Sequence, residues 1–233
     1  RFFMQYRPLG LSGIDVPVVS FGAWAAGGWM WGGADDDAAV RAIQHGIDLG
    51  ISCIDTAPAY GMGHSERIVG RAIAGRRDRA IIATKCGIRW DLDEGQHFFD
   101  TLDNEGNPCA LYRNLRPESI RYECEQSLRR LETEVIDLFQ CHWPDPTTPI
   151  EDTMGELARL RDEGKIRAVG VSNFSNEMID SAQQIVPIAS SQPKYNALER
   201  DAEKAHLPYC HEKKIGVLAY SPIAQGLLTG KVA

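Results

Sequence analysis

The chain has 233 residues, of which 43% are hydrophobic and 24% are charged, a composition that is ordinary for a globular protein. A net charge of -7 argues against nucleic-acid binding, because the longest basic cluster is only Arg76-Arg77-Asp78-Arg79. No apolar run approaches the roughly 18 residues that a membrane-spanning helix needs, and no signal-peptide pattern opens the chain.

The first fifty residues predict a hairpin, a buried strand and a helix. Residues 5–13 contain one proline and two glycines in a pattern typical of a short hairpin, and the apolar run 16–24 is expected to be the first buried strand. A glycine-rich loop follows. Asp35 and its two acidic neighbours predict the N-terminus of an amphipathic helix that ends at Gly50.

The same order of strand and helix recurs through the rest of the chain. Pro117 is expected in the first turn of one helix, and Ser65 and Ser175 are expected to cap two others. Nearly continuous apolar segments of this kind are typical of parallel strands that are buried on both faces. We expect six further strands, at 52–57, 80–85, 135–143, 166–173, 188–196 and 215–222.

Seven such units fit either a doubly wound sheet or a (β/α)8 barrel. No Gly-x-Gly-x-x-Gly opens a helix after a strand, which argues against the doubly wound dinucleotide-binding fold. We therefore predict an α/β fold, a (β/α)8 TIM barrel with a short N-terminal hairpin. We expect its eighth strand, last helix and C-terminal segment to lie outside this chain, so that residues 1–233 form a single, incomplete barrel domain.

Polar or aromatic side chains end the predicted strands, and in a barrel all of these ends lie on the rim that carries active sites. Taken singly, Asp55 can cap a turn, Tyr60 can pack in a loop and His142 can be a core histidine. Lys85 is harder to explain, because a buried ammonium is costly without a partner, and Asp55 on the neighbouring strand is the obvious one. The rim residues are Trp24, Asp55 with Tyr60, Lys85, His142, Ser172-Asn173, Gln192 and Tyr220-Ser221.

Together, Asp55, Tyr60, Lys85 and His142 predict a proton-donating site. A phenol has a pKa of about 10 in model peptides, and a neighbouring ammonium favours the phenolate and brings the proton closer to transfer at neutral pH. Asp55 would orient Lys85, and His142 would orient a substrate carbonyl or share in the proton relay. Such a set donates a proton to a carbonyl oxygen while a hydride reaches the carbonyl carbon.

On these motifs the chain resembles the aldo-keto reductase family over almost its whole length. Its Gly-Leu-Leu-Thr-Gly-Lys ending and its His-Trp-Pro-Asp segment are most similar to a bacterial and plant branch related to inositol-operon and potassium-channel-β-type reductases. The matching segments include Asp55-Thr56-Ala57, Tyr60-Gly61, Ala83-Thr84-Lys85, His142-Trp143-Pro144, Gly170-Val171-Ser172-Asn173-Phe174, Ala219-Tyr220-Ser221-Pro222 and Gly226-Leu227-Leu228-Thr229-Gly230-Lys231.

The resemblance implies reduction of a small-molecule carbonyl by NADPH, without excluding NADH, or the reverse oxidation of an alcohol or sugar. It makes Tyr60 the general acid, supported by Asp55, Lys85 and His142. The 2′-phosphate grip of the family lies outside this chain, so the NADPH preference rests on resemblance alone. Implied cofactor contacts are Gly22, Asp55, Ser172, Asn173, Gln192, Tyr220, Ser221, Pro222, Ile223, Gly226, Leu228 and Lys231, and implied substrate contacts are Trp24, Trp29 and Trp143.

Two other classes of function stay open. A regulatory subunit could keep the cofactor fold with little turnover, although the intact set of four residues argues for catalysis. A metal-dependent hydrolase using Asp55 and His142 would need further ligands at strand ends, and the sequence offers none. The six cysteines form no Cys-x-x-Cys pair, so we expect reduced thiols, no metal and a cytoplasmic protein. We expect no nucleic-acid or membrane partner, and the oligomeric state is open.

The insertion 86–115 is polar and carries several acidic residues. We expect it either to cover the substrate mouth, where its acidity would disfavour strongly anionic substrates, or to be a solvated surface loop without a catalytic part.

Overall fold

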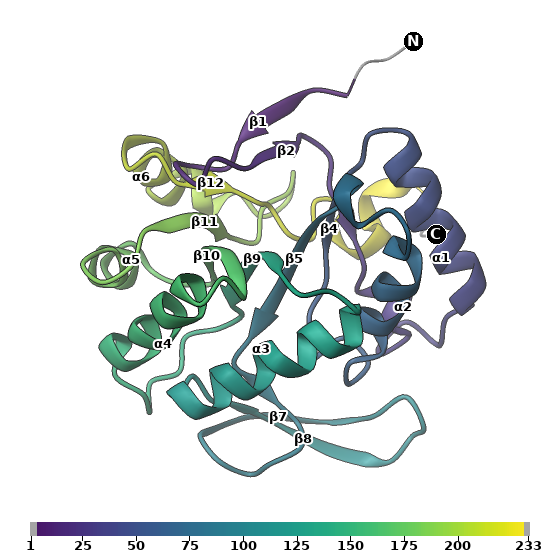
Figure 1. Ribbon diagram of the computed structural model, residues 1–233, viewed down its shortest axis with the longest axis horizontal. Coiled ribbons are helices and arrows are strands. Elements are labelled where there is room, and N and C mark those ends of the chain that lie inside the picture. The colour runs from purple at the N-terminus through teal and green to yellow at the C-terminus, as the bar shows by residue number, and fades with distance from the viewer. Residues whose placement is uncertain (1–3, 231–233) are drawn as a thin grey trace.

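A seven-stranded parallel sheet organises the computed structural model, which describes residues 4–230 (Figure 1). The strand order is β12-β11-β10-β9-β5-β4-β3, so each strand pairs with the parallel strand that precedes or follows it in the βα series. All the C-terminal ends of the strands therefore meet along one edge. The strands are β3 (Phe21–Gly22), β4 (Cys53–Asp55), β5 (Ile81–Cys86), β9 (Ile136–Cys141), β10 (Ile166–Ser172), β11 (Ile188–Gln192) and β12 (Gly216–Val217).

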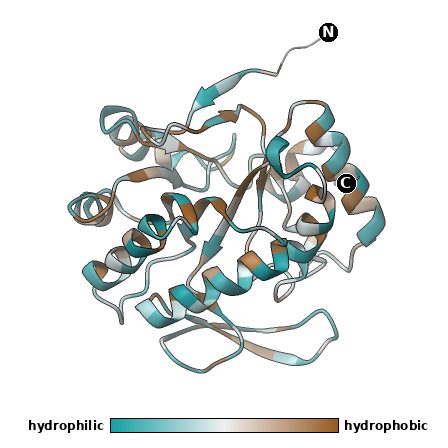
Figure 2. Ribbon diagram, in the orientation of Figure 1, coloured by the Kyte–Doolittle hydropathy of each residue, from teal (hydrophilic) through white to brown (hydrophobic). Residues whose placement is uncertain are grey.

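The helices surround the strands and turn their apolar faces toward them (Figure 2). Most of the core is packed between the two layers, where isoleucine, valine, leucine and cysteine side chains of strands and helices meet. Across the described residues, no helix is both long and apolar enough to cross a membrane. The α-helices are α1 (Asp36–Asp48), α2 (His64–Ile73), α3 (Pro117–Leu131), α4 (Ile150–Asp162), α5 (Asn176–Gln183) and α6 (His206–Glu212), with short 3-10 turns at Ala25–Gly27, Arg77–Arg79, Asp201–Glu203 and Ala224–Thr229.

A second, smaller core fills the side of the sheet that faces away from the helices. The N-terminal hairpin of β1 (Tyr6–Pro8) and β2 (Asp15–Pro17) places Leu9, Ile14 and Val16 there. They pack on Cys53, Ala83, Leu138, Ala168 and Ala189 of the strands. Because side chains alternate along a strand, the residues two positions further on face the same way. Asp55, Lys85 and Gln140 therefore form the next layer, nearer the C-terminal ends of the strands.

Two local predictions are wrong. The predicted strand 16–24 is divided between two sheets, because β2 pairs with β1 in the hairpin and β3 belongs to the parallel sheet. At the end of β2, Pro17 has no amide hydrogen to donate to a neighbouring strand, and Val18 and Val19 after it are exposed. Ser65 does not cap α2. Gly63 holds the N-cap position, and the Ser65 hydroxyl instead donates to the Ala23 carbonyl.

Three helix starts agree with the sequence. Asp35 accepts a hydrogen bond from the Ala38 amide, Ser175 accepts one from Met178, and Pro117 is the first residue of α3.

The insertion 86–115 forms a sheet of its own rather than an irregular loop. The short strand β6 (Ile88–Arg89) and the long strand β7 (Gln96–Leu102) both pair antiparallel with β8 (Pro108–Arg113). Figure 1 shows the β7–β8 hairpin projecting beside α3.

Candidate active site

The Lys85 ammonium lies at the centre of the polar layer. Its Nζ donates to Asp55 Oδ2 at 2.8 Å, to the Thr56 carbonyl at 2.9 Å and to Tyr60 Oη at 3.2 Å. An ammonium has three donors, and all three are used. The Lys85 side chain is 1% exposed, so these acceptors replace the water that it lost on folding. The predicted contact between Lys85 and Asp55 is present.

The fold places these residues together through strand register. Asp55 ends β4 opposite Ala83 of β5, and Lys85 is two residues further along β5 on the same face. Tyr60 follows in a tight turn that the loop after β3 presses against. A Cβ at Gly61 would lie 2.2 Å from the Gly27 carbonyl oxygen, and Gly61 has a φ of 67°. Only glycine fits this position without a shift of the backbone.

Two rings hold the Tyr60 phenol from different sides. Trp24 stacks on it with ring centroids 5.9 Å apart, and His142 meets it edge-on at 5.7 Å. His142 directly follows β9, and its amide donates to the Cys86 carbonyl, which joins it to the end of β5. The four predicted catalytic residues therefore form one contiguous group.

Burial sets the protonation of the group. Burial raises the pKa of Tyr60, and the Lys85 ammonium lowers that pKa by less. Burial lowers the pKa of Lys85, yet Asp55 and Tyr60 outweigh it and hold that pKa above its ordinary value. Burial, helped by Lys85, keeps the pKa of His142 well below its usual range. The site thus contains a protonated phenol, an ammonium and a neutral imidazole at neutral pH.

The prediction from the sequence concerned only the effect of Lys85 on the Tyr60 pKa and did not include the effect of burial. Lys85 acts in the expected direction, but loss of water around the phenol has the larger effect.

Gln140 belongs to this site and was not predicted. It is fully buried on β9, and its Nε2 donates to Asp55 Oδ1 at 3.4 Å, beside a 3.0 Å bond from Gln192 Nε2 to the same oxygen. Its position two residues before His142, on the same face of the strand, is the signal that could have revealed it.

A band of amide and hydroxyl groups continues from the four residues across β10 and β11. Asn173 donates to the His142 carbonyl at 3.1 Å and accepts a 3.0 Å bond from the Tyr220 hydroxyl. The Ser172 hydroxyl donates to the Gln192 carbonyl at 2.9 Å. Four of the predicted cofactor contacts, Ser172, Asn173, Gln192 and Tyr220, are therefore connected with the predicted catalytic group.

The other predicted cofactor contacts lie apart from this band. Gly22 is exposed on β3, in register with Asp55. Lys231 is outside the described residues. The remaining positions follow Tyr220 on a segment that is partly or fully exposed, and Asn196 donates to the Ser221 carbonyl at its start. These positions are Ser221, Pro222, Ile223, Gly226 and Leu228.

The predicted substrate contacts share one aromatic cluster. Trp24, Trp29 and Trp143 pack with side chains of the β7–β8 hairpin in a small apolar core of their own.

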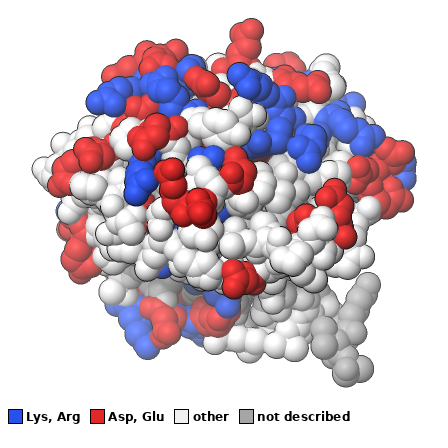
Figure 3. All heavy atoms as spheres, turned by 90° about the horizontal axis from the view of Figure 1, so that it is seen from below, with Lys and Arg blue, Asp and Glu red and all other residues white. Residues whose placement is uncertain are grey.

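The surface carries both signs of charge, interspersed on the face seen in Figure 3, so no single-sign field marks a binding surface there.

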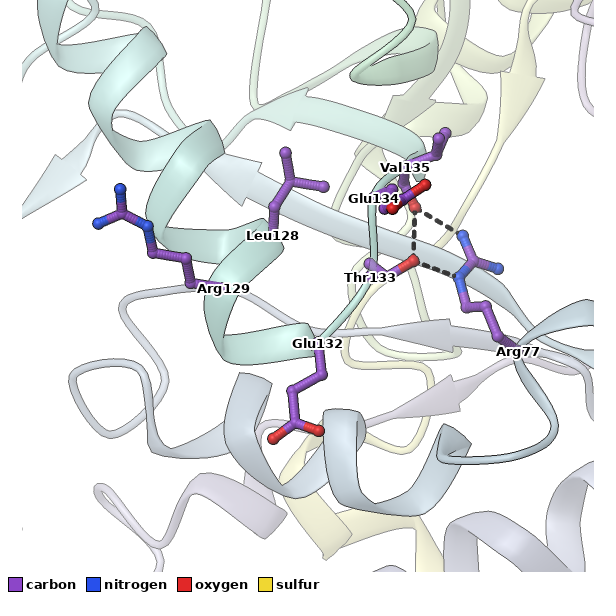
Figure 4. Close-up of a pocket in the computed structure, with 7 residues that line it drawn as sticks. All are labelled: Arg77, Leu128, Arg129, Glu132, Thr133, Glu134 and Val135. Carbon is purple, nitrogen blue, oxygen red and sulfur yellow. Dashed lines mark hydrogen bonds between the residues drawn. The ribbon is translucent and has the colours of Figure 1, made fainter.

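A hollow of about 650 Å³ lies at the opposite end of the strands. Figure 4 shows Arg77 reaching across it to Thr133 and to the Val135 carbonyl, with which it makes bonds of 2.9 Å and 2.7 Å. Arg77 also pairs with the buried carboxylate of Asp137 at 2.7 Å. Because these residues precede β5 and β9, they lie at the N-terminal end of the strands. Residues at that end of a barrel contribute to stability rather than to catalysis. Among residues 4–230, no cluster of His, Cys, Asp or Glu could hold a metal ion.

Comparison with known proteins gives consistent matches. Residues 18–233 match the Aldo/keto reductase family. Aldo-keto reductase YhdN of Bacillus subtilis is 44% identical, over 98% of this chain and 65% of the relative, so the chain spans about two thirds of that protein's length. The NADH-specific methylglyoxal reductase of Escherichia coli is 40% identical, over 98% of this chain and 70% of the relative.

A solved structure, that of the glycerol dehydrogenase AKR11B4 from Gluconobacter oxydans, superimposes with a TM-score of 0.85 and 48% identity, over 98% of this chain and 66% of that one. This likeness confirms the predicted α/β barrel fold, to which the described residues contribute seven parallel strands. The chain belongs to the aldo/keto reductase family.

Proposed function

We propose that the protein is a nicotinamide-dependent reductase that converts a carbonyl to an alcohol, or catalyses the reverse oxidation, with Tyr60 as the proton donor. The observation that carries this proposal is the placement of the Lys85 ammonium between the Asp55 carboxylate and the Tyr60 hydroxyl, 2.8 Å and 3.2 Å away. A lysine buried only for structure needs a counter-ion, and Asp55 provides it. The additional bond to the phenol in the turn after β4 suits proton transfer.

The protonation states support this role. The Tyr60 phenol keeps its proton because burial raises its pKa, so it is in the donor form at neutral pH. When it gives the proton to a carbonyl oxygen, a phenolate forms next to Lys85, whose charge stabilises it. The neutral imidazole of His142, edge-on to the same phenol, is suited to hydrogen-bond the substrate oxygen.

The amide and hydroxyl band fits a nicotinamide carboxamide. That group has one acceptor oxygen and an NH2 donor, and Ser172, Asn173 and Gln192 offer both kinds of partner next to the proton donor. Tyr220, held by its bond to Asn173, presents a ring for stacking. A bound nicotinamide cofactor supplies the hydride. We propose NADPH, with NADH as the alternative that the name of the Escherichia coli relative supports.

The names of the relatives support both directions of the reaction. One is a methylglyoxal reductase and another is a glycerol dehydrogenase. We therefore propose small uncharged carbonyl compounds and alcohols as the substrate class.

The test is a turnover screen of the full-length protein. NADPH and NADH consumption is followed with methylglyoxal, benzaldehyde and glyceraldehyde, and cofactor reduction is followed with glycerol. We expect turnover with at least one carbonyl substrate. Tight cofactor binding without turnover would contradict the proposal and favour a regulatory subunit.

A further inference from the structure

The aromatic side chains at the rim form a circuit of neighbouring rings, in which His142 and Trp143 are joined through the backbone and all other neighbours by ring contacts. Trp24 stacks on Tyr60, and the Tyr60 ring meets His142, the residue before Trp143. The hairpin closes the circuit from the other side, through two phenylalanines of β7. Centroid separations along it are 5.4 Å for Trp143–Phe98, 4.9 Å for Phe98–Phe99, 6.3 Å for Phe99–Trp29 and 6.4 Å for Trp29–Trp24. All are within the range of favourable ring contacts.

A β-bulge allows both phenylalanines to join the circuit. Successive residues of a regular strand point to opposite faces, so Phe98 and Phe99 would normally diverge. The pairing of β7 with β8 shifts between His97 and Phe99, which leaves Phe98 as the extra residue. A bulge of this kind redirects a side chain, and bulges are frequent beside active sites. Here it turns Phe98 toward Trp143 while Phe99 lies flat against Trp29, at an interplanar angle of 9°.

The hairpin is fastened to the rim at several points. Asn104, at its tip, donates to the Gly27 carbonyl at 2.8 Å, and Trp29 Nε1 donates to the Leu102 carbonyl at 3.1 Å. Arg113 of β8 donates to the Pro144 carbonyl, directly after Trp143. The two phenylalanines are therefore held in position within the circuit that contains Tyr60 and do not belong to a free surface loop.

The charges around the circuit indicate which substrates suit it. Lys85 Nζ lies 5.0 Å from the Tyr60 ring centroid, and the Arg113 guanidinium lies 5.0 Å from that of Phe98. Asp55 neutralises Lys85, so Arg113 is the charge that a cationic substrate would meet at Phe98, and the acidic residues of the same insertion disfavour an anionic substrate. The buried Nε1 of Trp24 has no hydrogen-bond partner in the described structure, so it can serve a neutral polar atom. The rings offer apolar faces to an uncharged, flat group.

We infer that β7 is a specificity element in which Phe98 and Phe99 complete an aromatic wall beside Tyr60. The wall selects uncharged carbonyl substrates that carry a flat apolar group, such as aryl aldehydes. This inference rests on the proposed function and adds the substrate class and two specificity-determining residues to it.

The test compares benzaldehyde with glyceraldehyde, both uncharged, by their ratio of kcat/KM in the full-length protein. Replacing Phe98 or Phe99 by Ala should lower that ratio about tenfold, because the aryl group loses a stacking partner that a polyol does not need. The conservative variants Phe98→Leu and Phe99→Leu keep the apolar volume and should lower the ratio by a smaller factor. Leu102→Ala changes an exposed side chain of the same strand outside the circuit and keeps the carbonyl that binds Trp29, so it should leave the ratio unchanged. Cofactor affinity should be constant throughout.

A binding measurement separates this inference from the proposed function. Benzyl alcohol binding, followed by tryptophan fluorescence, needs no turnover, and Phe98→Leu and Phe99→Leu should weaken it severalfold relative to Leu102→Ala. Absence of turnover in the wild type with weakened binding in these variants would overturn the function and retain the aromatic wall. An unchanged ratio, or equal benzyl alcohol affinity in wild type and variants, would overturn the wall itself.

Discussion

Replacement of Lys85 by Met removes the charge at the centre of the site and keeps most of the side-chain volume. The structure predicts two effects. Asp55 loses its cation and keeps only the amides of Gln140 and Gln192 as partners, and breaking a buried pair in this way costs about 3–5 kcal/mol of unfolding free energy. The phenolate formed at Tyr60 also loses its stabilising charge, so turnover should fall by at least about 100-fold, the lower end for proton-transfer catalysis.

Urea unfolding measures the first effect of Lys85→Met, and steady-state reduction of a carbonyl substrate measures the second. Lys165→Met is the matched control, because Lys165 pairs with Glu125 at 3.0 Å near the surface. An exposed pair contributes at most about 1 kcal/mol, and turnover should be unchanged. Lys85→Arg keeps the charge and provides a folded reference if the methionine variant is unstable. Full turnover in Lys85→Met with intact cofactor binding would refute the role of the ammonium.

Two further predictions concern stability. Burial raises the pKa of Glu123 from 4.5 to about 8, so the folded state binds this proton more tightly than the unfolded state does. The folded state therefore loses stability as pH rises from about 4.5 through 8, by roughly 5 kcal/mol at most. Glu123→Gln keeps an acceptor for the Gly87 amide and should gain stability relative to wild type between pH 5 and pH 9, as thermal unfolding at both values can check; a constant difference would contradict this. Arg77→Ala removes one of the two arginines that pair with the buried Asp137, which keeps Arg167 at 2.9 Å and the Ile82 amide at 2.8 Å; it should cost about 1.5–3 kcal/mol, without a change in kcat. The exposed Arg129→Ala in the same hollow should cost less than about 0.5 kcal/mol, and equal costs would show that the Arg77 contacts contribute little.

The sequence predicts most of the site because its residues interrupt apolar strands. Lys85 and His142 stand out at strand ends, and parallel register then brings them to Asp55 without further information. Gln140 was not predicted because it lies inside such a strand, where a single polar residue is easily taken for part of the core. The Thr56 carbonyl, which accepts a bond from Lys85, belongs to the backbone and has no residue-type signal at all.

Other errors arise where tertiary contacts decide. The apolar run 16–24 looks like one strand, but pairing with β1 takes its first residues into the hairpin. Sequence shows that Lys85 favours a Tyr60 phenolate, and only the fold shows that burial outweighs it. The insertion 86–115 is polar in composition, and the bulge at Phe98 breaks the alternation by which β7 could have been predicted.

The central claim is that Tyr60 gives the proton, and Tyr60→Phe tests it most directly because it removes one hydroxyl and keeps the ring between Trp24 and His142. Single-turnover reduction of a carbonyl substrate and cofactor affinity are measured in the same full-length protein. We predict that reduction falls at least about 100-fold while cofactor affinity changes little. Reduction at the wild-type rate, or loss of cofactor binding as the primary defect, would contradict this role.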